Sequence, residues 1–125
     1  MKKLLTALVI IVSFGTAGSV YAQDFDKGLR AAQSGDFVTA LKEWTALAEQ
    51  GNASAQYGLG FKYRKGIGVV QDNVYAHMWF NIAASNGNQG AMKGRDMIAK
   101  QMTAADISKA QGLARACVEK KFKGC

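Results

Sequence analysis

Apolar residues recur at intervals of three and four through most of this chain, which is the spacing of one face of an α-helix. Between positions 37 and 48 this pattern is formed by Phe37, Ala40, Leu41, Trp44, Leu47 and Ala48. No stretch alternates apolar and polar residues for long enough to predict a strand, and proline is absent from the 125 residues. The pattern therefore predicts an all-α protein.

Capping residues divide the pattern into six expected helices, over about residues 24–33, 36–51, 52–63, 72–87, 88–98 and 104–121. Asp36, Asn52 and Asp72 stand where a side-chain oxygen can accept from free amides at a helix start. Gly51 suits the left-handed position after a helix end, and Thr103, with an aspartate three residues later, resembles a capping box. We expect three antiparallel helical pairs. The apolar stripes of the last two helices contain Ala91, Met92, Ile98, Ile107, Ala110, Leu113, Ala114 and Cys117.

Part of the pattern repeats after thirty-six positions. Asp36, Ala40, Ala48, Gly51 and Ala55 recur as Asp72, Ala76, Ala84, Gly87 and Ala91. A fixed period in the thirties is typical of stacked helical hairpins, in which each unit buries its apolar face on the next. The sequence therefore predicts a short α-solenoid, an architecture that usually binds other molecules rather than catalysing reactions.

Small residues in the central unit predict close helix packing. Gly60, Ala76, Ala83 and Ala84 allow a neighbouring helix to approach, while Tyr63 and Trp79 fill the space between helices. Gly66 and Gly68 permit the backbone angles of a tight reversal. The structural interpretation of these residues is favoured over a catalytic one.

The segment over residues 53–88 resembles one complete Sel1-like repeat. The resemblance rests on Ala55, Leu59, Gly60, Tyr63, Gly66, Gly68, Val69, Asp72, Ala76, Trp79, Ala83, Ala84 and Gly87. Residues 25–50 are similar to an incomplete leading unit and residues 91–114 to closing helices, whereas Val70 stands where proline is common in the family. The resemblance implies a TPR-like solenoid of about three hairpins over residues 23–125. The residues themselves offer no candidate catalytic, cofactor-binding or metal site.

The first 22 residues have the layout of a secretory signal peptide. A basic start, Met1-Lys2-Lys3, precedes an apolar run over residues 4–14, and Val20-Tyr21-Ala22 ends the segment with compact residues three and one before the expected cut. The apolar run is shorter than the roughly 20 residues of a membrane span. We therefore predict cleavage after Ala22 and export to the periplasm or the medium.

Cys117 and Cys125 are the two cysteines of the chain. Export to an oxidising compartment favours a disulfide between them, and the terminal segment over residues 116–125 also resembles that of exported Sel1-like proteins. The alternative, a metal site, lacks a third and a fourth ligand nearby. We expect a disulfide that holds the C-terminal tail on the last helix.

The chain is basic, with a formal net charge of +7. The excess is concentrated in two clusters, Lys62, Arg64 and Lys65, and Lys120, Lys121 and Lys123. We interpret these clusters as solvated faces; if they bind, an acidic protein, an anionic lipid or a cell-wall polymer is favoured. Export argues against nucleic acid.

Candidate catalytic chemistry is sparse. His77 is the one histidine, and we place it at the surface or in a groove, beside the apolar stripe. The serines show no nucleophile-elbow pattern. The Sel1-like resemblance implies a non-catalytic exported adaptor that binds a protein or peptide through its concave helical face, and Tyr57, Tyr75 or Trp44 are candidate anchors. The alternative is a β-lactam- or cell-wall-fragment-binding protein or hydrolase, like the cysteine-rich Sel1-like proteins; the single cysteine pair weakens it.

Overall fold

The computed structural model describes residues 17–125, and these residues form six α-helices. The helices are α1 (Ala17–Gln33), α2 (Phe37–Glu49), α3 (Ala53–Lys65), α4 (Asn73–Ser85), α5 (Gln89–Ala99) and α6 (Ala104–Glu119). The all-α prediction is confirmed. Residues 1–16 of the predicted signal peptide lie outside the described residues, so its cleavage stays a prediction.

Helix α1 begins earlier than expected. The expected start is near residue 24, whereas the helix begins at Ala17 and continues through the predicted cut after Ala22. Three of the residues around the cut, Tyr21, Ala22 and Gln23, are compatible with a helix, and no proline interrupts them.

Local side-chain chemistry fixes the other helix starts. Asp36, Asn52, Asp72, Asn88 and Thr103 each accept a hydrogen bond from a backbone amide in the first turn of the helix that follows. The bond from Ala55 N to Asn52 Oδ1, for example, measures 2.9 Å. Helices α1 to α4 are each followed within two residues by a glycine with positive φ, among them Gly51 at 88° and Gly87 at 96°. The predicted N-caps and the left-handed conformation of Gly51 are therefore confirmed; of the capping box at Thr103, the bond from the Asp106 amide to Thr103 Oγ1 is present.

The thirty-six-residue period of the sequence reappears in the helices. Helix α4 has the same length as α2 and begins thirty-six positions later, and α3 and α5 begin at the same interval. Trp44 of α2 lies where Cβ atoms on Gly28 of α1 and Gly58 of α3 would meet its ring, and Phe80 of α4 lies in the same way between Gly60 and Gly94. A large ring between two glycines is therefore the repeated packing unit.

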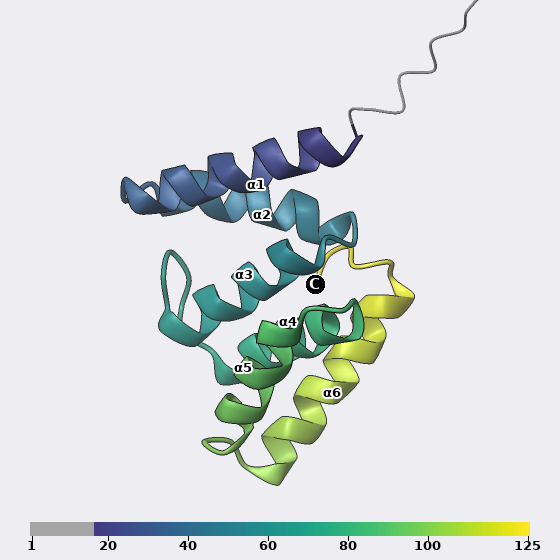
Figure 1. Cartoon of the computed structure of the whole chain (residues 1–125). Helices are drawn as coiled ribbons and strands as arrows, with labels where there is room; N and C mark the ends of the chain where they lie inside the picture. Colours follow the sequence, from purple (N-terminus) through teal and green to yellow (C-terminus); the bar gives the residue numbers. More distant parts are fainter. Residues whose placement is uncertain (1–16) are drawn as a thin grey trace, which may run out of the picture.

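Sequential helices pack on one another, and α4 occupies the centre (Figure 1). Helix α1 packs on α2, α2 on α3 and α3 on α4, and both α5 and α6 pack on α4. This arrangement confirms sequential antiparallel hairpins. The main core cluster contains Trp44, Leu47, Ala48, Ala55, Leu59, Met78, Trp79, Ile82, Ala114 and Cys117, and the second contains Ala76, Phe80, Ala83, Ala91 and Ile98.

The inward stripe of α5 differs from the expected one. Met92 is 46% exposed, so the prediction that it faces the core is wrong. The buried residues of α5 are Ala91, Gly94 and Ile98, whose spacings of three and four place them on one face. Met92 is one position, or about 100°, away from Ala91 around the helix.

Positive φ angles explain the loop between α3 and α4 and the end of α6. Gly66 and Gly68 have φ angles of 69° and 72°, as the predicted reversal between α3 and α4 requires. Helix α6 ends at Glu119 rather than near Lys121, because Lys121 and Phe122 adopt left-handed φ angles of 55° and 66°.

The tail that follows α6 is held by a covalent bond. Cys117 and Cys125 form the expected disulfide, with Cα atoms 5.7 Å apart. Phe122 packs against the main core cluster within the loop that the disulfide closes. In the described part of the chain, no helix is long and apolar enough to cross a membrane.

Candidate functional site

An apolar groove opens between the first hairpin and α3. Its cavity has a volume of about 380 Å³. We call it the Lys62 groove, and its lining residues are Phe25, Leu29, Ala32 and Gln33 of α1, Phe37 and Trp44 of α2, Tyr57, Gly58, Phe61 and Lys62 of α3, and Ile67 of the following loop. Three helices from two successive hairpins therefore build the site.

Helical spacing explains how α1 and α2 reach the groove. Phe25, Leu29 and Ala32 are four and three positions apart, so they share one face of α1. The rings of Phe25 and Trp44 stack with their centroids 5.7 Å apart. Trp44 Nε1 donates a hydrogen bond of 3.3 Å to the Phe25 carbonyl oxygen, which satisfies the indole within the wall of the groove.

Lys62 places a cation in this apolar wall. The residue is 2% exposed, and its Nζ lies 5.0 Å from the centroid of the Trp44 ring and 5.2 Å from that of Phe37. It donates one long hydrogen bond, of 3.5 Å, to the Phe37 carbonyl oxygen. Burial lowers the pKa of the Lys62 ammonium, because removal from water disfavours the charged form.

The rim of the groove presents large apolar side chains to solvent. Leu29 of α1 and Phe61 of α3 are each 40% exposed. Lys65 Nζ lies 5.9 Å from the centroid of the Phe61 ring, and Lys65 itself is exposed. The groove therefore has an apolar interior, one buried cation and a rim that is both apolar and basic.

The interpretation of Lys62 as part of a solvated basic face is wrong. Arg64 and Lys65 keep contact with solvent, whereas Lys62 is buried. A signal was present in the sequence, because Lys62 lies three positions after Leu59 and seven after Ala55, on the buried face of α3. The charge of a lysine favours an exposed position, whereas the helical spacing favours the buried position that Lys62 occupies.

The proposed aromatic anchors separate into different environments. Trp44 belongs to the main core cluster, so it lines the groove from inside rather than projecting from the surface. Tyr57 lines the groove and packs near Phe80, with ring centroids 5.7 Å apart. Tyr75 is exposed, and its ring stacks on that of Tyr63 with the centroids 5.4 Å apart. Burial raises the pKa of Tyr63, and the nearby Tyr75 and Asp72 raise this pKa further.

His77 is buried rather than at the surface or in a groove, so its predicted place is wrong. It is 3% exposed, and its Nδ1 has no hydrogen-bond partner among the described residues. Burial lowers the pKa of His77; the positive charge of Arg95 lowers it further, and Asp96 opposes both effects. His77 lines neither the Lys62 groove nor the two cavities described below.

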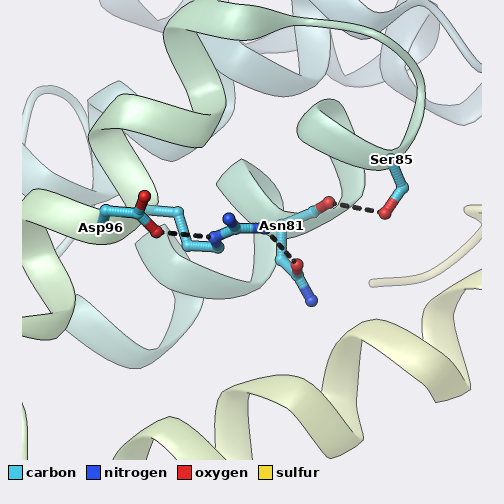
Figure 2. A network of polar contacts seen from close by, with 4 residues as sticks. Asn81, Ser85 and Asp96 are labelled. Carbon is cyan, nitrogen blue, oxygen red and sulfur yellow. Dashed lines mark hydrogen bonds and ion pairs between the residues drawn. The ribbon is translucent and has the colours of Figure 1, made fainter.

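A polar network of Asn81, Ser85, Arg95 and Asp96 joins α4 and α5 (Figure 2). Arg95 donates to Asn81 Oδ1 and to Asp96 Oδ1, each over 3.2 Å, and Ser85 Oγ donates to the Asn81 carbonyl oxygen over 3.0 Å. Only the bond from Arg95 to Asn81 connects the two packed helices; the other two bonds lie within α4 and within α5. The network is accounted for by helix packing.

The residues of the repeat motif have packing roles instead of groove roles. Ala55, Leu59, Gly60, Ala76, Trp79 and Ala83 are buried, and Tyr63, Val69 and Ala84 are partly buried. None of the residues that carry the resemblance lines the Lys62 groove. The residues of the repeat motif pack the helices together, and the groove is lined by other residues of the same hairpins.

Two other cavities are smaller than the Lys62 groove. One, of about 320 Å³, lies between α4 and α6, beside Ala114 and Val118, and a smaller one, of about 130 Å³, lies beside the disulfide. Within residues 17–125 no group of histidine, cysteine, aspartate and glutamate side chains is arranged to hold a metal ion.

No protein-family model matches the sequence, and no curated protein matches it.

Proposed function

We propose that this chain is a non-catalytic, exported interaction module of the Sel1-like, TPR-like type, which binds a protein or peptide partner in the cell envelope at the Lys62 groove. The repeat motif over residues 53–88, the thirty-six-residue period and the sequential hairpins support this type of module. A disulfide between Cys117 and Cys125 supports an oxidising compartment. The signal-peptide layout of residues 1–22 supports export.

The apolar rim of the groove is the observation that carries the proposal. Leu29 and Phe61 leave large apolar surface in water on either side of an open apolar cavity. Contiguous apolar surface of this kind marks interaction sites, since its removal from water favours association. Apolar side chains of a partner can cover this rim while Lys65 attracts acidic groups beside it.

The alternative of a β-lactam hydrolase gains no support from the groove. Its lining contains no serine, threonine or cysteine, which are the usual acyl acceptors. The binding of a partner is therefore the function that the site supports best.

Affinity capture with matched variants tests the proposal. Protein purified after export is used as bait for an envelope extract, alongside Leu29→Ser, Phe61→Ser and, as control, Met92→Ser on α5, which is 46% exposed and outside the groove. We expect a partner that the native chain and the Met92 variant retain and that both rim variants lose. Equal capture by all four proteins would contradict the proposed site, and a native chain that retains no partner would contradict the adaptor function.

A further inference from the structure

Lys62 is a buried cation that has no counterion among residues 25–125, whose side chains the structure describes. The two ion pairs of the described residues, Lys27–Glu43 and Arg95–Asp96, do not include it. An ammonium can donate three hydrogen bonds, and Lys62 Nζ makes one, of 3.5 Å, to a backbone carbonyl. Buried charges are normally paired, whereas the Lys62 ammonium faces the rings of Phe37 and Trp44, and two of its donors have no acceptor among the described residues.

The remaining wall of the groove offers little else to a polar ligand. Apart from Lys62, polar side-chain ends come from Gln33, Tyr57 and Trp44, and the Trp44 indole already donates to Phe25. A partner's side chains can cover the rim, but a peptide backbone inserted into the interior of the groove would leave its amides without hydrogen-bond partners. A hydrocarbon chain has no such groups, and the aromatic lining suits it.

The size of the groove also favours a small ligand. Its volume of about 380 Å³ lies at the lower end of the roughly 300–1,000 Å³ range of small-molecule sites. A ligand with one anionic group and an apolar body of modest length therefore matches Lys62 and the apolar lining of the groove.

We propose that the Lys62 groove binds a free alkanoic acid, with its carboxylate on Lys62 Nζ and its hydrocarbon chain along Phe25, Leu29 and Phe61. The carboxylate accepts the hydrogen bonds that the ammonium leaves unused, and its charge compensates the buried cation. This inference goes beyond the proposed function, because it assigns a small-molecule ligand to the groove and does not require a partner protein.

Calorimetric titration with decanoate tests the inference, with decanol as an uncharged ligand of equal chain length and decylamine as a cationic one. For the native protein we expect decanoate to bind about tenfold or more tightly than decanol, since hydrogen bonds to a charged group contribute about 1.5–3 kcal/mol. Decylamine should not bind. Absence of decanoate binding, or equal affinities for decanoate and decanol, would overturn the proposal without any variant.

Two lysine variants locate the charge. Lys62→Met should lose about tenfold or more in decanoate affinity and keep its decanol affinity, whereas Lys109→Met, at an exposed position of α6, should behave as the native protein. Retained decanol binding and a cooperative thermal melt show that the groove of the Lys62 variant is intact. Unchanged decanoate affinity in the Lys62 variant would overturn the assignment.

The outcomes separate this inference from the proposed function. Partner capture without decanoate binding would remove the alkanoic acid site and leave the adaptor function. Decanoate binding that depends on Lys62, without partner capture, would establish the ligand site and contradict the adaptor function.

Discussion

Single residues without a side chain decide how closely these helices approach. Phe80 lies between Gly60 of α3 and Gly94 of α5; a Cβ on Gly60 would lie 2.5 Å from Phe80 Cδ1, and one on Gly94 would lie 3.2 Å from the same ring. Gly112 of α6 differs, because the nearest atom to a Cβ there is a terminal nitrogen of Arg115, 3.8 Å away. The two types of glycine should respond oppositely to alanine.

Gly60→Ala should lower the free energy of unfolding by about 1 kcal/mol or more, because the cost of overpacking, about 1–3 kcal/mol, exceeds the gain in helix propensity. Gly112→Ala should raise it by about 0.5–1 kcal/mol, because the helix gains propensity without a steric conflict. Urea denaturation followed by circular dichroism measures both. A Gly60→Ala protein as stable as the Gly112→Ala protein would contradict the packing around Phe80.

His77 should make stability depend on pH. Burial holds its pKa in the folded chain below the ordinary 6.5, so between these two values the unfolded chain binds more protons than the folded one. Stability should therefore be complete above pH 6.5 and fall as the pH decreases through the interval below it. Arg95 acts in the same direction as burial, and Asp96 acts against it.

The measurement is the melting temperature between about pH 7 and about pH 5 for the native protein and for His77→Leu. We expect the native protein to lose more stability on acidification than the variant, which has no imidazole to protonate. Parallel pH profiles would show that His77 is already free to ionise in the folded chain.

At the scale of elements, N-cap side chains set where the helices begin, and a disulfide holds the C-terminal tail on α6. Five N-cap side chains start α2 to α6. After α6, the disulfide between Cys117 and Cys125 closes a short loop, and Phe122 packs inward within it. None of α1 to α5 is contained in that loop, so their hydrogen bonds do not depend on the disulfide.

Reduction, or Cys125→Ser, should lower stability by about 2–3 kcal/mol on the chain-entropy account of a short loop. The far-UV circular dichroism below the melting transition should keep its helical signal. Reductant should have no further effect on the Cys125→Ser protein, which serves as the control. Loss of the whole helical signal on reduction would contradict this division between tail and helices.

At the scale of the molecule, the groove lies where the first hairpin, α1 and α2, meets α3. Helix α2 contacts both neighbours, while Phe25 and Leu29 of α1 and Phe61 of α3 face the same cavity. The net charge of +7 creates a field that attracts anions. The rim variants test this surface for a partner, and the decanoate titration tests its interior for a carboxylate.

Sequence alone determined the six helices, their N-caps, the thirty-six-residue period and the cysteine pair. Helical periodicity and capping depend on residues a few positions apart, so they can be recognised along the chain. The tertiary structure decided that Lys62 and His77 are buried and that Met92 is exposed. It also decided that an apolar groove surrounds Lys62, because the burial of a side chain depends on which distant helix covers its face.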